Sequence, residues 1–92
     1  KSLKIYPSPF YIPSDRPLII SGVIQGSSIL ITTITGEVIR SKKHEDMGLH
    51  GNQITWNGRD SSGNLVGSGV YLLSIYSQDG LNAVEKITVI RY

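Results

Sequence analysis

The chain has 92 residues and no cysteine, and nine basic and seven acidic side chains give it a formal net charge of +2. This length suits one domain, and the missing cysteines exclude disulfide frameworks, thiolate catalysis and cysteine-based metal sites. The scattered charges do not favour nucleic acid or an anionic membrane as a partner, and no apolar run approaches the roughly 20 residues that cross a bilayer. Because the chain begins at Lys1 and not at Met, we expect residues 1–92 to be a single domain excised from a larger protein, with upstream domains as neighbours.

Short apolar runs rich in Ile, Val, Thr and Tyr predict β-strands, and turn-forming residues separate them. The predicted strands are Leu3 to Tyr6, Pro17 to Ile24, Ser28 to Ile34, Glu37 to Lys42, Gln53 to Trp56, Val70 to Ser77 and Ala83 to Arg91. No stretch predicts a helix of useful length. Short, closely spaced strands favour a sandwich over a parallel sheet, which needs crossover helices. The predicted fold is therefore all-β: a seven-stranded antiparallel immunoglobulin-like β-sandwich.

Alternation along the strands predicts which side chains are buried. The predicted core residues are Ile29, Ile31, Tyr71, Leu73, Ile75, Ile87 and Val89. Trp56 is also expected in the core, since a sandwich this small needs most of its aromatic rings there. The opposite faces carry Leu30, Leu72 and Ile90 among polar residues, which suggests that a neighbouring domain covers some of this surface.

Glycine and proline mark the predicted turns. Thr35-Gly36 predicts a two-residue hairpin turn, and the polar run 57–64 predicts tight turns. The prolines at positions 7, 9, 13 and 17 cannot donate to a sheet, so the first strand is expected to be short, interrupted or at an edge. The polar segment Ser41 to Asn52 is expected to be a loop.

Three groups of side chains could carry chemistry. His44, Glu45, Asp46 and His50 are chemically sufficient for zinc, but they lack a helical frame, so a solvated loop is the favoured interpretation.

The alternating oxygens of Asp60, Ser62 and Asn64 suggest a calcium loop, but tight turns explain them equally and the acidic ligands of such a loop are missing. Ser68 lies between two glycines without the helix of a nucleophile elbow. No catalytic, cofactor or metal site is predicted.

Four segments in order carry a family resemblance, and together they span nearly the whole chain: Tyr6 to Phe10, Ile29 to Ile39, Trp56 to Tyr71, and Lys86 to Arg91. The chain resembles the immunoglobulin-like C-terminal domains of the type IX secretion system (Por secretion system) of Bacteroidetes, which are similar to the immunoglobulin-like part of flagellar hook-capping proteins. The most specific part of the resemblance is a structural motif made of Trp56, Gly58, Asp60, Gly63, Gly69 and Tyr71.

The resemblance implies a non-catalytic address label on a secreted or cell-surface protein that is associated with the outer membrane. Implied partners are secretion or sortase attachment-complex proteins and anionic lipopolysaccharide. Similar domains are also retained after β-propellers, including in a component of the attachment complex. Lys86, Arg91 and Tyr92 correspond to the family's terminal recognition region.

Two other functions stay open from the sequence. A structural spacer would pack on an upstream propeller or enzyme domain. A carbohydrate-binding module would need an exposed Trp56 as a platform for sugar rings. An enzyme is not expected, because no group of residues has the arrangement of an active site.

Overall fold

The structure is a computed structural model that describes residues 3–23, 26–42 and 53–92. These residues form strands and turns, and no helix is found among them. The described strands are β1 (Lys4–Tyr6), β2 (Phe10–Ile12), β3 (Leu18–Ser21), β4 (Ser28–Thr33), β5 (Val38–Lys42), β6 (Gln53–Trp56), β7 (Gly69–Ser77) and β8 (Gly80–Arg91).

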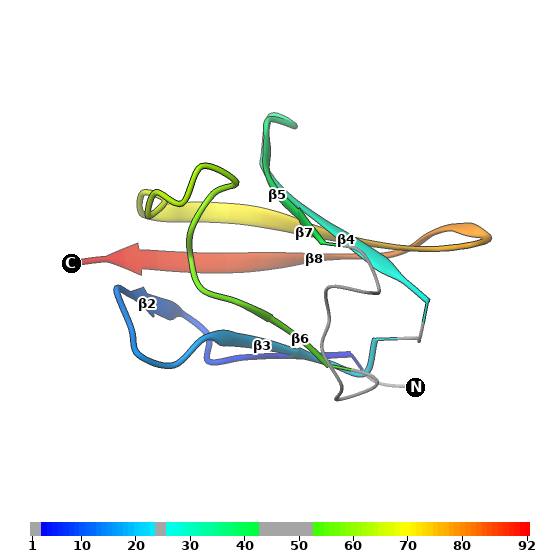
Figure 1. Cartoon of the computed structure of the whole chain (residues 1–92), viewed down its shortest axis with the longest axis horizontal. Helices are drawn as coiled ribbons and strands as arrows, with labels where there is room; N and C mark the ends of the chain where they lie inside the picture. Colours follow the sequence, from blue (N-terminus) through cyan, green and yellow to red (C-terminus); the bar gives the residue numbers. More distant parts are fainter. Residues whose placement is uncertain (1–2, 24–25, 43–52) are drawn as a thin grey trace.

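The strands form two sheets that pack against each other as two layers (Figure 1). One sheet has the order β1-β3-β6 and the other β2-β8-β7-β4-β5. Neighbours in the first sheet are antiparallel, and β8, β7, β4 and β5 are also antiparallel to one another. The all-β, two-layer prediction is confirmed.

The predicted strand count and the purely antiparallel pairing are wrong for the described chain. It contains eight strands, and β2 pairs with β8 in parallel, with Phe10 beside Val89 and Ile12 beside Arg91. Proline explains why β1 ends so early, since Pro7 and Pro9 have no N–H to donate to a sheet. The chain therefore leaves the first sheet after Tyr6 and enters the second one, where three residues suffice to pair with the last strand.

The turn between β4 and β5 is one residue longer than predicted. The Gly36 N–H donates to the Thr33 carbonyl at 3.0 Å, and the Thr33 N–H donates to the Glu37 carbonyl at 2.9 Å. Gly36 has a φ of +97°, which an L-residue with a side chain rarely adopts. The predicted hairpin is confirmed, with a three-residue loop that ends on this glycine.

The core lies between the two layers and contains all seven residues that alternation predicted. Trp56 is 1% exposed, so its predicted burial is also confirmed. Its ring lies 6.1 Å from that of Phe10 and 6.2 Å from that of Tyr71, measured between centroids. Trp56 ends β6 in one sheet, while Phe10 and Tyr71 come from the other, so this aromatic cluster joins the layers.

We predict that Trp56→Ala lowers the free energy of unfolding by about 3 to 5 kcal/mol, the range for deleting a large buried ring. Chemical denaturation monitored by circular dichroism measures the change. Tyr92→Ala is the control, because that ring is 81% exposed and should cost less than about 1 kcal/mol. Equal effects of the two substitutions would contradict the central place of Trp56 in the core.

Candidate recognition site

The loop from Asn57 to Ser68 is anchored at both ends by the aromatic cluster. The indole N–H of Trp56 donates to the Arg59 carbonyl at 2.9 Å, and the Tyr71 hydroxyl donates to the Gly67 carbonyl at 2.8 Å. Burial raises the pKa of Tyr71 above its usual value, although the hydrogen bond to Gly67 acts in the opposite direction. The polar atoms of both rings therefore hold the loop against the core.

Asp60 organises the centre of this loop. Its Oδ1 accepts hydrogen bonds from the Ser62 N–H at 2.9 Å and the Asn64 N–H at 3.0 Å. The Asp60 N–H also donates to the Asn64 carbonyl at 2.8 Å, and the Gly63 N–H donates to the Asp60 carbonyl at 3.0 Å. These bonds are those of tight turns closed by an aspartate side chain. The described residues contain no group of three or more His, Asp or Glu side chains that could hold a metal ion.

The glycines of the motif have different structural roles. Gly58 is buried with a φ of +79°, and a Cβ added there would lie 2.9 Å from Cγ2 of Ile12. Gly63 has a φ of +88° with open space around it, so only its backbone conformation favours glycine. Gly69 begins β7 beside Val89. Gly58 is thus the position where β2 packs directly against the loop.

Ser68 ties the end of the loop to the last strand. Its hydroxyl oxygen accepts a hydrogen bond from the Arg91 N–H at 2.8 Å. The Arg91 guanidinium reaches back to the Leu65 carbonyl at 3.4 Å. The hydroxyl of Ser68 therefore has a structural partner, in keeping with the turn that the sequence favoured over a nucleophile.

The three predicted recognition residues do not meet at one point. Lys86 pairs with Leu72 on the outer face of the five-stranded sheet, whereas Arg91 pairs with the buried Ile12 and turns toward the loop. Lys86 and Arg91 are five positions apart along an extended strand, which corresponds to roughly 17 Å. Tyr92 follows directly and its N–H donates to the Ile12 carbonyl at 3.0 Å. Arg91 and Tyr92 form one exposed end, and Lys86 lies apart from it.

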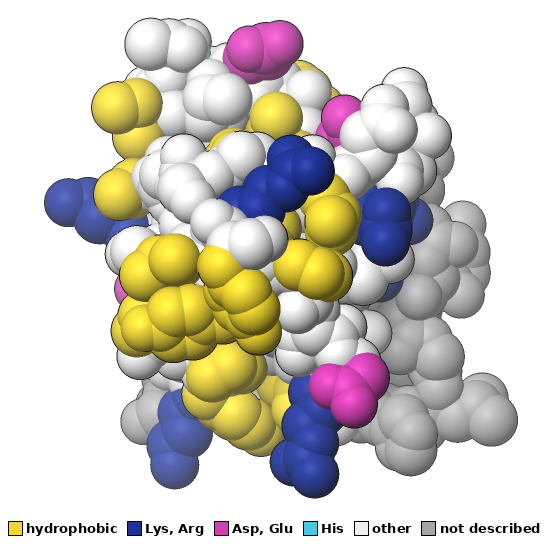
Figure 2. Space-filling view, turned by 90° about the vertical axis from the view of Figure 1, so that its left-hand side faces the viewer, with side chains coloured by type: hydrophobic (Ala, Val, Ile, Leu, Met, Phe, Trp, Pro, Cys, Tyr) yellow, Lys and Arg dark blue, Asp and Glu magenta, His cyan; other side chains and the backbone are white. Residues whose placement is uncertain are grey.

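Exposed tyrosines gather at this same end, which the sequence analysis did not predict. Tyr6 and Tyr11 are 44% and 49% exposed, and the Tyr11 ring lies 6.2 Å from that of Tyr92. Tyr6, Tyr11 and Arg16 line a groove of about 510 Å³ together with Pro7, Phe10, Ser14, Pro17 and Ile19. Figure 2, which views the molecule from the end where the chain terminates, shows hydrophobic side chains gathered there with Lys and Arg around them. The dense tyrosines and prolines of residues 6–17 were the signal for this surface.

The outer face of the five-stranded sheet is also partly apolar. Val70, Leu72, Val84 and Ile90 lie on it, in register with polar partners such as Thr88 and Ser74. Leu72 is half-buried and the other three are exposed. The apolar outer surface that the strand pattern indicated is therefore present.

The histidine cluster and Trp56 were the other candidate binding groups in the sequence. His44, Glu45, Asp46 and His50 lie outside the described residues, as does most of the segment Ser41 to Asn52. Trp56 is buried, so it cannot serve as the platform of a carbohydrate-binding module. Within the described ranges, no helix has the length and hydropathy needed to span a membrane.

Comparison with solved structures gives a likeness over nearly the whole chain. The structure of PorZ, described as an essential bacterial surface component of the type IX secretion system of Porphyromonas gingivalis, superimposes with a TM-score of 0.76 and 28% sequence identity. The match covers 97% of this chain and 11% of the PorZ chain. No family model matches the sequence, and comparison with curated proteins gives no match. The likeness therefore relates this chain to a small part of a type IX secretion component, the same system to which the sequence motifs pointed.

We predict that Gly58→Ala destabilises the domain by about 2 to 4 kcal/mol, because it adds a clash with Ile12 to an unfavourable backbone conformation. Gly63→Ala is the matched control with a similar φ and open space, and it should cost only about 1 to 2 kcal/mol. Thermal and denaturant unfolding measure both. If the two variants were equally stable, the close approach of β2 to the loop would not contribute to the stability of the domain.

We predict that neither millimolar calcium nor a chelator changes the melting temperature. The Oδ1 atom of Asp60 already accepts two backbone hydrogen bonds, and a ligand stabilises a fold only by binding its native state. Scanning fluorimetry with calcium, with magnesium and with EDTA provides the test. A rise in the melting temperature with calcium alone would identify the loop as a calcium site.

Proposed function

We propose that this domain is a non-catalytic recognition module associated with the type IX secretion system, acting at the bacterial cell surface in sorting or attachment. The observation that carries the proposal is the likeness to PorZ, with a TM-score of 0.76 over 97% of the chain. The motif from Trp56 to Tyr71 also supports the proposal, because it is the most specific part of the family resemblance, and in the structure its residues build the anchored loop.

The proposed fold family is immunoglobulin-like. The strand order β8-β7-β4-β5 corresponds to the G-F-C-C′ order of one sheet of an immunoglobulin variable domain. The opposing sheet, β1-β3-β6, then takes the place of strands A, B and E. In this scheme β2 is the part of the first strand that crosses to the opposite sheet.

A non-catalytic role agrees with the hydrogen bonds that the polar groups of the loop form within the domain. Asp60 and Ser68 hold backbone amides in place, and the polar atoms of Trp56 and Tyr71 bond to loop carbonyls. These groups therefore serve folding, and recognition falls to exposed side chains. Arg91 and Tyr92 lie together and are the proposed contact residues. Their proposed partner is a secretion or sortase attachment-complex protein, or anionic lipopolysaccharide.

A structural spacer is the second candidate function, and the apolar outer face of the five-stranded sheet favours it. Val70, Val84 and Ile90 expose apolar surface there. Burying such surface against another domain would stabilise the pair, since apolar burial contributes about 25 cal/mol per Å². A spacer would need this face, whereas a recognition module would need the end formed by Arg91 and Tyr92.

We predict that replacing Lys86, Arg91 and Tyr92 together by Ala removes most surface delivery of a reporter fused upstream of the domain in a bacterium that has the type IX system. Lys86→Ala alone should cost well under about 1 kcal/mol of stability, as an exposed substitution. Protease accessibility on whole cells measures delivery, and thermal unfolding verifies that the variants fold. Deleting β8 would be uninformative, because it removes Ile87 and Val89 from the core.

Lys4→Ala and Tyr76→Ala provide the control for this experiment. Both side chains are exposed and lie away from the end formed by Arg91 and Tyr92. Delivery should be normal in this double variant. If the triple variant folded and was delivered as well as the control, the recognition role would be lost and the spacer function would replace it.

A further inference from the structure

The last strand is much longer than the strand that covers its outer edge. β8 has twelve residues, and β7 pairs with it from Gly80 to Val89. On its other side β2 pairs only with the stretch from Val89 to Arg91. In the described part of the chain, the edge of β8 before Val89 has no partner strand. Every second residue of an antiparallel strand directs its N–H and C=O groups away from its neighbour, so this edge offers unused backbone donors and acceptors.

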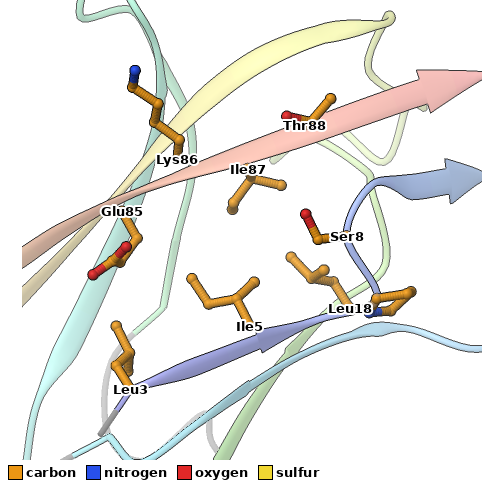
Figure 3. Close-up of a pocket in the computed structure, with 9 residues that line it drawn as sticks. Leu3, Ile5, Ser8, Leu18, Glu85, Lys86, Ile87 and Thr88 are labelled. Atoms are coloured by element: carbon orange, nitrogen blue, oxygen red, sulfur yellow. The ribbon is translucent and has the colours of Figure 1, made fainter.

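A second groove, of about 200 Å³, lies beside this free edge, between β8 and β1 (Figure 3). β1 is itself the edge of its sheet and pairs only with β3 among the described strands. Figure 3 shows Ile5, Leu18 and Ile87 extending into the space between the two strands. The groove therefore combines an apolar floor with a free strand edge on either side.

Glu85 adds a charge to the mouth of this groove. It pairs with the buried Leu73, so it lies on the inward-facing row of β8 and not on the outer face with Lys86. Its side chain is exposed, and no ion pair to it is found in the described ranges. A charge on the inner face of an edge strand discourages pairing with an arbitrary apolar strand. It also favours a strand that brings a basic residue to the same point.

From these observations we infer that the free edge of β8 is a docking site for an extended polypeptide segment of a partner protein. The segment adds as a strand in line with β2, with its backbone bonded to β8 between Gly80 and Thr88. Alternate apolar side chains enter the groove over Ile5 and Ile87, and a Lys or Arg pairs with Glu85. Only an extended polypeptide supplies backbone donors and acceptors at the spacing of a strand. This inference does not depend on a role in type IX secretion.

The test uses a display library of random nine-residue peptides selected on the immobilised 92-residue chain. Selected peptides should alternate apolar and polar residues, contain a Lys or Arg, and contain few prolines. Nuclear magnetic resonance with one such peptide should show slowed hydrogen exchange at the β8 amides between Gly80 and Thr88. Methylating alternate peptide nitrogens should abolish binding, because those N–H groups form the added ladder.

Charge reversal makes the test specific to the proposed site. Glu85→Lys should lower the affinity for the selected peptide about tenfold, since it places like charges opposite each other. Exchanging the basic residue of the peptide for Glu should restore binding to this variant. Glu37→Lys is the matched control, because it makes the same charge change at the exposed β4–β5 turn, outside the groove. The affinity of that variant should not change.

Several outcomes would overturn the proposal. It is wrong if no peptide is enriched, or if the peptides protect the groove lined by Tyr6 and Tyr11 and leave β8 unprotected. If Glu85→Lys and Glu37→Lys lost affinity equally, the net charge of the domain, and not a contact with Glu85, would explain the binding. If sedimentation showed a dimer whose β8 amides are already protected, the occupant would be a second copy of the chain and not a partner segment.

Discussion

The packing of Trp56 between the two sheets is the contact on which the remaining structure depends. The ring ends one strand of the smaller sheet and meets Phe10 and Tyr71 from the larger one. Its N–H also reaches the Arg59 carbonyl, so the same side chain that joins the layers fixes the start of the long loop. Removing a buried polar partner is costly, which makes the ring and the loop one unit of the fold.

The loop in turn positions the end of the domain where recognition is proposed. Asp60 closes its turns, Ser68 bonds the Arg91 N–H, and Gly58 lets β2 approach closely. The ends of β2 and β8 lie together because of these contacts, and Tyr92 is thereby brought near Tyr11. A motif whose residues are used for folding can thus determine where an exposed recognition surface lies, without touching the partner.

The short β2 strand has a further structural consequence. Prolines confine it to three residues, so it completes the core with Phe10 and Ile12 but covers only the last part of β8. A longer strand would have closed the flank of the sandwich. The open edge and the inward-facing Glu85 occur on the same stretch, which is how natural sheets limit unspecific pairing while keeping an edge available.

Much of this fold could be predicted from the sequence, because alternation and turn residues act locally. Ile87 and Val89 follow the period of a strand, and Gly36 satisfies a turn with positive φ, so the buried row and the hairpin were both predicted. Trp56 was placed in the core because a small sandwich needs its large rings there. The pairing of β2 with β8 depends on residues almost eighty positions apart in a sequence of 92, and no local pattern encodes whether such a pair is parallel. For the same reason, only the tertiary structure revealed that Tyr11 meets Tyr92 and that none of the described strands covers the edge of β8 before Val89.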